Sequence, residues 1–492
     1  MTGGALSLAD LGALTLTPAD LDDVAPLSDR LSPEYLEHHR VLPVRRHGDV
    51  LLAATWAEDE SVDPQATDDL RLLLDVREVH LVAWPEAPLR QAIRRTYAPD
   101  TTARGVIAGM ADVAVAASGR TEMALDDLVS MANEAPVVKL VNLLLLEALD
   151  ARASDLHLES SVEGVRTRYR VDGVLIDAPA PPAHLAAALV SRLKIMADLD
   201  IAERRLPQDG RMRLRLQDRQ VDVRVSIVPT LDGESVVLRL LDKEQGRISF
   251  ARLGMPDDVR ATFEGAVRRP HGIVLATGPT GSGKTTSLYA AVELIRTGRE
   301  KIMTVEDPVE YELRGVAQVP VHEKIGVTFA SALRALLRQD PDVLMVGEIR
   351  DSETAEIAIQ AALTGHLVLS TLHTNDAASA LTRLLDLGVA PFLVASTVEA
   401  VLAQRLVRRL CDSCRGKGCA SCAETGFLGR IGIYELLNVD DAIREAIAAR
   451  RSAGELAQLA RRGGMRTLSE RGQDLVRAGV TTAAEVARVT RE

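Results

Sequence analysis

Short apolar runs alternate with helix-spaced apolar positions through the second half of the chain. Residues 272–276, 302–305 and 343–347 are mainly apolar runs bounded by polar residues, which is typical of buried strands in a parallel sheet. Apolar residues between 288 and 295 recur at helical spacing instead. This alternation of strand and helix patterns predicts an α/β core over residues 244–405, with a parallel sheet covered on both faces.

The first half of the chain follows other patterns. Residues 1–97 combine two short apolar runs, 42–44 and 50–54, with a helical pattern over 87–97, and predict a small α/β domain. Residues 98–120 are rich in Ala and Gly and are typical of a linker. Residues 121–243 predict an α+β domain. Its helix covers 137–151 and its alternating strands, with many arginines on their polar face, cover 165–171, 212–216, 221–227 and 236–240.

Composition narrows the possible functions. The net charge of −12 makes the chain a poor nonspecific binder of nucleic acid, and an aromatic content of 3% leaves few rings for stacking on bases. The first thirty residues carry several aspartates and no basic segment of a signal peptide. The longest apolar run, 137–149, contains Lys139 and Glu147 and is not expected to span a bilayer. We therefore expect a cytoplasmic protein.

One segment has the pattern of a phosphate-binding loop. Residues 278–286 match G-x-x-x-x-G-K-[ST] at every fixed position and lie between a predicted strand and a predicted helix. Backbone N–H groups of such a loop bind a polyphosphate at a helix N-terminus. We expect Lys284 to reach the outer phosphates of ATP and the Thr285 hydroxyl to bind Mg²⁺. The candidate nucleotide-binding residues are Gly278, Pro279, Thr280, Gly281, Ser282, Gly283, Lys284, Thr285 and Thr286.

Two other predicted strands end in carboxylates. The run 343–347 precedes Glu348, and the run 302–305 precedes Glu306. In phosphate-loop ATPases, a strand beside the loop strand ends in an acid near the γ-phosphate, so we expect Glu348 to orient the attacking water. Glu306 is a second catalytic candidate, because ligands bind at the carboxyl ends of strands in open parallel sheets.

Two histidines, His366 and His373, flank a further apolar run at 367–372. They are seven residues apart, so a single metal site is not expected. At the ends of a strand in the same sheet, they could contact phosphate or sense its loss.

All four cysteines lie in two C-x-x-C pairs, Cys411 with Cys414 and Cys419 with Cys422. Paired turns of this kind present four thiolates to Zn²⁺, and four neighbouring cysteines also suit an Fe–S cluster. The four residues between the pairs, 415–418, include two glycines, which permit a tight reversal. In a reducing compartment, this clustering favours a metal over disulfides.

The order of these motifs resembles the secretion and pilus-assembly ATPases, and most of all the type II secretion ATPases of the general secretion pathway protein E group. The resemblance is carried by the phosphate loop and by residues 305–311 (V-E-D-P-V-E-Y), 337–351 (L-R-Q-D-P-D-V-L-M-V-G-E-I-R-D) and 364–376 (T-G-H-L-V-L-S-T-L-H-T-N-D). Residues 153–159, 170–173 and 207–211 resemble the domain that precedes the ATPase core in this family. The match runs from about residue 126 to about residue 435.

The resemblance implies a fold and a set of roles. The implied order is an N-terminal docking domain (1–97), a linker (98–120), a PAS-like α+β domain (121–243), a RecA-like ATPase core (244–405), a zinc-binding knuckle (406–430) and a helical C-terminal domain (431–492). It also implies a homo-hexamer in which Arg224 and Arg239 reach the phosphates of a neighbouring copy, with Arg334 and Arg338 as weaker candidates of the same kind. The segment between the cysteine pairs is shorter here than in the family.

The implied function is ATP hydrolysis that drives pseudopilus assembly and protein export by a type II secretion system. Its cofactors would be Mg²⁺ and Zn²⁺. The N-terminal domain would hold the ATPase at the inner membrane by binding platform proteins, so that its membrane association is indirect. Pilus or competence-pilus assembly is the alternative within the class. A nucleic-acid motor is the alternative from another class, and stimulation of hydrolysis by single-stranded DNA would favour it.

Overall fold

The computed structural model describes residues 16–17, 20–21, 24–28, 31–56, 64–97, 103, 107, 135–161, 164–216, 219–242 and 250–490. Two compact units are present: residues 1–244 with 411–426, and residues 245–410 with 427–492. Apart from Ala103 and Ile107, the predicted linker 98–120 lies outside the described residues.

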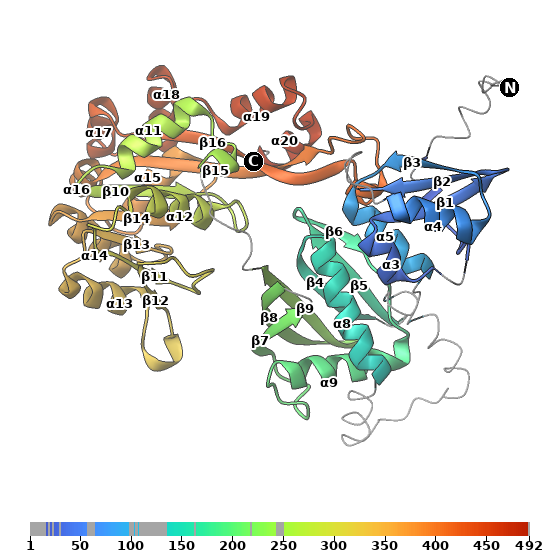
Figure 1. Ribbon diagram of the computed structural model, residues 1–492. Coiled ribbons are helices and arrows are strands. Elements are labelled where there is room, and N and C mark those ends of the chain that lie inside the picture. Colours follow the sequence, from blue (N-terminus) through green and yellow to red (C-terminus); the bar gives the residue numbers. More distant parts are fainter. Residues whose placement is uncertain are drawn as a thin grey trace. The chain divides into compact units, whose positions relative to one another are not determined.

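The second unit is built on a seven-stranded sheet in the order β12-β11-β13-β14-β10-β15-β16 (Figure 1). All neighbouring strands pair in parallel except β15 and β16, which form an antiparallel hairpin. The predicted parallel sheet is therefore confirmed, with one antiparallel strand at its edge. The strands are β10 (Gly272–Thr277), β11 (Ile302–Glu306), β12 (Ala317–Pro320), β13 (Val343–Val346), β14 (Leu367–Leu372), β15 (Val398–Leu410) and β16 (Phe427–Asn438).

Helices cover both faces of this sheet, because alternate residues of each strand pack in opposite directions. Ile273 and Leu275 of β10 join one apolar cluster, and Val274 and Ala276 join another. The first cluster includes residues of α13 (Phe329–Leu336), α14 (Ser352–Leu363), α15 (Ala377–Asp386) and α16 (Pro391–Thr397). The second includes residues of α10 (Phe250–Leu253), α11 (Asp257–Val267) and α12 (Lys284–Ile295).

Four C-terminal helices follow β16: α17 (Asp441–Ala448), α18 (Ala453–Arg462), α19 (Leu468–Arg477) and α20 (Ala483–Thr490). Residues of all four pack on the first of these clusters. Strand β16 extends the core sheet, so the sheet continues beyond residue 405, where the sequence pattern ended it. The cysteine turn is an insertion between two paired strands, Leu410 lying opposite Phe427, and it interrupts the apolar pattern that would have joined them.

The first unit begins with a three-stranded sheet, β1 (Val41–His47), β2 (Val50–Thr55) and β3 (Glu78–Ala83). It packs with α3 (Pro33–His38), α4 (Pro64–Leu74) and α5 (Glu86–Tyr97) around one small core. Helix α5 lies where the 87–97 pattern predicted it. The expected α/β character of the N-terminal segment is confirmed.

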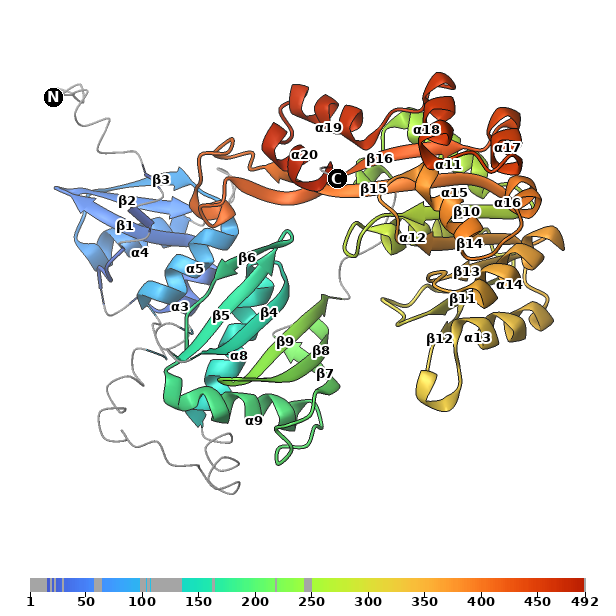
Figure 2. The ribbon, with the colours of Figure 1, turned by 180° about the vertical axis from the view of Figure 1, so that it is seen from behind.

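A six-stranded antiparallel sheet in the order β6-β5-β4-β9-β8-β7 forms the rest of this unit (Figure 2). Its strands are β4 (Ala153–Ser161), β5 (Gly164–Val171), β6 (Val174–Asp177), β7 (Gln208–Leu216), β8 (Arg219–Thr230) and β9 (Gly233–Asp242). Helices α8 (Ala135–Asp150) and α9 (Ala186–Met196) pack on its apolar face. The alternating pattern leaves the polar residues on the opposite face, which carries many arginines.

Candidate active site and metal centre

The predicted catalytic segments meet at the carboxyl edge of the seven-stranded sheet. The phosphate loop follows β10, Glu306 is the last residue of β11, Glu348 follows β13 and His373 follows β14. Because β10, β11, β13 and β14 are parallel, their carboxyl ends lie on one edge. Residues separated by up to 95 positions in the chain are thereby brought together.

The phosphate loop requires glycine where other chain segments approach it closely. A Cβ on Gly278 would lie 2.6 Å from the Gln404 carbonyl oxygen, and one on Gly283 would lie 2.9 Å from Gln404 Nε2. Both glycines also have positive φ, of 149° and 89°. Helix α12 begins directly afterwards at Lys284, so the loop lies at a helix N-terminus as predicted.

Lys284 is held by its own loop. Its ammonium donates to the carbonyl oxygens of Gly278 at 2.7 Å and Pro279 at 3.1 Å. Burial lowers the pKa of Lys284 to about 8, with Glu348 opposing and Arg405 adding to the shift. A pKa of about 8 still leaves most Lys284 side chains protonated at neutral pH, so the ammonium can exchange its carbonyl partners for a phosphate.

Two buried polar residues of β15 lie close to the phosphate loop, and one of them is bonded to it. Gln404 donates its amide to the Ser282 carbonyl at 2.7 Å. Arg405 donates to the carbonyl oxygens of Gln404, Asn375 and Val489. Neither residue was among those selected from the sequence. The sequence signal for them is a Gln-Arg pair between the apolar residues 400–403 and 406–407, since buried polar side chains require hydrogen-bond partners.

Glu348 is contacted by one cation and one histidine. Arg350 donates to Oε1, and His373 Nε2 lies 3.0 Å from Oε2. Burial raises the pKa of Glu348, but the hydrogen bonds from Arg350 and His373 outweigh it and hold that pKa below its usual value. The Glu348 carboxylate is therefore ionised, and its orientation is fixed by a partner on each oxygen. Arg350, only two residues from Glu348, was not among the residues selected from the sequence.

Glu306 occupies a more enclosed position. It is buried, and its carboxylate accepts hydrogen bonds from Thr304 Oγ1 at 2.6 Å, from Gln318 Nε2 at 3.0 Å and from the Tyr289 hydroxyl. Tyr289 lies on α12, so the acid connects the helix of the phosphate loop to the adjacent strands.

The two histidines lie at opposite ends of β14. His373 is at the carboxyl edge, beside Glu348. His366 precedes the strand and lies 2.9 Å through Nδ1 from the Ala361 carbonyl oxygen, at the end of α14. The strand thus separates them, and of the pair it is His373 that lies with the other candidate residues.

A row of charged residues crosses the polar face of the six-stranded sheet. Arg211 pairs with Arg224, Arg224 with Arg239, and Arg239 with Asp155 on adjacent strands. Directly opposite like charges are unfavourable in a sheet, so the three consecutive arginines concentrate positive charge on this face. With Asp209, Gly210 and Ser226, the three arginines line a cavity of about 310 Å³. Arg211 was not selected from the sequence, although it belongs to the quoted segment 207–211.

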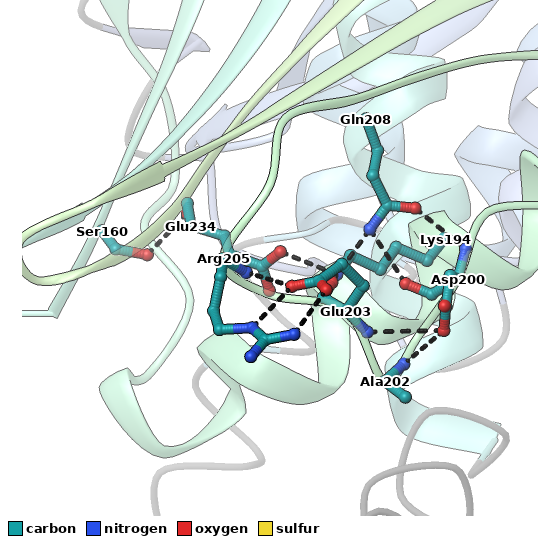
Figure 3. Close-up of polar contacts among 8 residues, drawn as sticks. All are labelled: Ser160, Lys194, Asp200, Ala202, Glu203, Arg205, Gln208 and Glu234. Atoms are coloured by element: carbon teal, nitrogen blue, oxygen red, sulfur yellow. Dashed lines mark hydrogen bonds and ion pairs between the residues drawn. The ribbon is translucent and has the colours of Figure 1, made fainter.

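Residues 200–208, which lead into β7, are held by hydrogen bonds from Gln208 and from Lys194 (Figure 3). Gln208 accepts from the Asp200 N–H at 2.9 Å and donates to the carbonyl oxygens of Asp200 and Glu203. The buried Lys194 donates to the Glu203 carbonyl oxygen at 2.6 Å and pairs with Glu234 at 2.7 Å. These contacts fix the start of β7, and therefore the register that places Arg211 opposite Arg224.

The four cysteine sulfurs converge within the segment 411–426, which connects β15 to β16 in the chain. Three Sγ–Sγ distances, 411 to 419, 414 to 422 and 419 to 422, are 3.7, 3.8 and 3.6 Å, and all four sulfurs lie within 4.8 Å of one another. A tetrahedral ion with metal–sulfur bonds of about 2.3 Å has edges of about 3.8 Å. The N–H groups of Cys419 and Gly426 also donate to Cys422 Sγ. The donor set therefore fits one tetrahedral ion.

The strand before Glu348 was expected directly beside the strand of the phosphate loop, but β14 lies between β13 and β10. A parallel sheet with a phosphate loop after β10 and a glutamate held in place after β13 defines a phosphate-loop ATPase. Comparison with known proteins shows to which family of ATPases the chain is similar. Residues 130–488 match the model of the Type II/IV secretion system protein family, and residues 10–103 match the MshEN domain. The chain belongs to the Type II/IV secretion system protein family.

Relatives are similar over nearly the whole chain. Type II secretion system protein E of Xanthomonas campestris pv. campestris is 45% identical over 99% of this chain and 89% of its own. The type IV pilus assembly ATPase PilB of Myxococcus xanthus is 44% identical over 94% of this chain and 87% of its own. A crystal structure of the pilus retraction motor PilT with bound ADP has a TM-score of 0.51 and 28% identity over 71% of this chain and 96% of that one.

These likenesses confirm the predicted ATPase and its α/β architecture. Within the described ranges, every helix is too short or too polar to cross a bilayer.

Proposed function

We propose that the chain hydrolyses ATP to drive pseudopilus assembly in a type II secretion system. The observation that carries this proposal is the meeting of Lys284 and Glu348 at one sheet edge, in a chain of this family. The loop N–H groups and Lys284 bind the phosphates, and Glu348 accepts a hydrogen bond from the attacking water. Thr285 would hold Mg²⁺, which neutralises phosphate charge when bound. Glu306 remains a catalytic proposal.

Two substitutions test the reaction. Lys284→Ala removes the phosphate contact and should abolish both ATP binding and hydrolysis. Glu348→Gln keeps the shape of the side chain but loses the charge, so ATP binding should persist while kcat falls by roughly 10² or more. The measurements are ATP binding by calorimetry and steady-state hydrolysis. A Glu348→Gln protein that turns over ATP at the parental rate would refute this assignment.

We propose further that the active form is a homo-hexamer in which the arginine row contributes to a neighbouring site. Arg224 and Arg239 would contact the phosphates bound by the next copy, and Arg211 joins them because it lines the same cavity. Arginines supplied from another chain stabilise transition-state charge in phosphoryl transfer. The alignment of like charges on adjacent strands supports this role.

Zinc is our proposal for the cysteine site. The sulfur spacing suits a single ion, whereas a cluster of several irons would hold the four thiolates farther apart. Cys411, Cys414, Cys419 and Cys422 would hold Zn²⁺ as a structural ion, with all four positions closed by thiolate.

For location, we propose a cytoplasmic protein held at the inner membrane by platform proteins that bind the N-terminal domain. Relatives named as type II secretion proteins support this arrangement. The pilus-assembly alternative is supported by the similarity to PilB. A platform protein and pseudopilins encoded beside the gene would favour secretion over pilus assembly. Hydrolysis stimulated by single-stranded DNA would instead favour a nucleic-acid motor.

A further inference from the structure

The row described above consists of Arg211, Arg224, Arg239 and one acid, Asp155. This acid contacts Arg239 at Nε and not at a terminal amino group. Asp155 Oδ1 accepts a hydrogen bond from Arg239 Nε at 3.1 Å. A guanidinium has five N–H donors, and its two terminal amino groups form the fork that grips phosphate. The bond to Nε does not occupy this fork, so Arg239 can be held by Asp155 and bind an anion at the same time.

Asp155 is itself held in place. Its side chain is 8% exposed, and Oδ2 accepts from the Ser154 hydroxyl at 2.7 Å and faces Arg170 Nε at 3.8 Å. The side chain of Arg239 is 54% exposed. The buried carboxylate of Asp155 is thus fixed, and the Arg239 side chain that it binds is partly exposed to solvent.

The positive charge of Arg224 explains why Arg239 needs the hydrogen bond to Asp155. Arg224 lies directly opposite Arg239 on β8, so two cationic side chains lie side by side on this face of the sheet, an arrangement that is unfavourable for like charges. Without Asp155, Arg239 would be displaced from the row by Arg224 and would sample many rotamers. The same two arginines line the cavity described above.

We infer that Asp155 is a positioning residue that presents the guanidinium fork of Arg239 to the nucleotide phosphates of a neighbouring copy. The inference rests on the proposed role of Arg239 across the ring. It adds that the direction of Arg239 is set within its own sheet before nucleotide arrives.

This role predicts a specific kinetic signature. The phosphate loop of the neighbouring copy already binds ATP in the ground state, so misdirecting Arg239 should mainly weaken the transition state. Asp155→Ala should therefore lower kcat about tenfold while KM changes less than about twofold. A general loss of structure would instead lower the thermal midpoint and the fraction of assembled rings.

The test is a double-mutant cycle in the full-length chain, at a concentration where rings form. Hydrolysis is measured for the parent, Asp155→Ala, Arg239→Ala and the combined variant. If Asp155 acts through Arg239, the combined variant should be no slower than Arg239→Ala alone. Asp155→Asn, which keeps an acceptor oxygen, should recover part of the lost kcat.

Glu159→Ala is the matched control. Glu159 lies on the same face of β4 and forms an ion pair with Arg168 of the other neighbouring strand, β5, outside the row. It should retain parental kcat. If Asp155→Ala unfolds well below this control, the cycle is repeated with Asp155→Asn in its place.

The possible outcomes distinguish the positioning role of Asp155 from the role of Arg239 in the neighbouring site. Equal losses from Asp155→Ala in the parental and Arg239→Ala backgrounds would overturn the inference, since Asp155 would then act without Arg239. Parental kcat for Asp155→Ala beside a slow Arg239→Ala would overturn the inference and leave the role of Arg239 standing. Parental kcat for Arg239→Ala would overturn both.

Discussion

At the scale of single residues, the main feature of the site is how Glu348 is held. Arg350 and His373 each contact one oxygen of its carboxylate. The acid that should orient water is thus ionised, and each of its oxygens has a side-chain partner. The opposing contribution of burial means that this state depends on the two partners.

Replacing Arg350 should change the pH dependence of hydrolysis. In Arg350→Gln, the pKa of Glu348 should rise, because the lowering contribution of the guanidinium is gone while the burial remains. Glu348 must be ionised to work, so the acid limb of the kcat profile should move to higher pH, by up to about one unit.

Steady-state rates between pH 5 and 8 would measure this shift. Arg461→Gln is the control, since Arg461 forms a half-exposed ion pair with Glu470 in the C-terminal helices. An unmoved acid limb in Arg350→Gln would show that Arg350 does not govern the ionisation of Glu348.

At the scale of elements, the β15–β16 hairpin combines two roles. Its paired stretch places Gln404 under the phosphate loop, and the connection between its strands carries the four cysteines. The hairpin register is continuous from Ala400 to Arg408, so the residues under the loop do not depend on the cysteine turn for their pairing.

Purified protein should carry about one zinc per chain. Cys414→Ser removes one of four thiolates, so the metal should be lost and residues 411–426 should exchange amide hydrogens faster. Ser421→Ala is the matched control in the same turn and should keep its zinc. Elemental analysis that finds iron, or no metal after purification without chelator, would contradict the assignment.

At the scale of the whole molecule, the proposed ring makes each active site depend on two chains. A Lys284→Ala chain cannot use its own site but still carries the arginine row, while an Arg239→Ala chain lacks the arginine but keeps its phosphate loop. Mixing the two inactive proteins should therefore restore part of the hydrolysis rate. The measurement is activity against mixing ratio, beside a demonstration of mixed rings. Mixed rings without recovery would rule out action across the interface.

The N-terminal domain leads to the last prediction. Residues 1–97, most of which match the MshEN domain, should bind the cytoplasmic part of an inner-membrane assembly protein if they are the docking domain proposed above. A chain of residues 121–492 keeps the whole seven-stranded sheet, so basal hydrolysis should remain measurable while membrane recruitment is lost. Fractionation of cells expressing either form would test this. Equal sedimentation of both forms with membranes would place the anchor elsewhere.

Local features of the sequence were enough to predict much of this protein. The phosphate loop, the strands before Glu306 and Glu348 and the paired cysteines are short segments whose patterns specify their own geometry. The strand and helix alternation also predicted the parallel sheet, since apolar runs of that length must be buried on both faces. The edge strand β16 was missed, because the cysteine insertion separates it from its partner β15.

Only the tertiary structure decided which distant residues meet. The contacts of Gln404 with the phosphate loop, of His373 with Glu348 and of Asp155 with Arg239 join positions from 25 to 122 residues apart. They depend on strand order and register, and a shift of one residue would turn each side chain to the other face. A local sequence pattern does not specify strand order or register. The sequence therefore predicted the chemical groups of the site, and only the folded structure identified the residues that hold them in place.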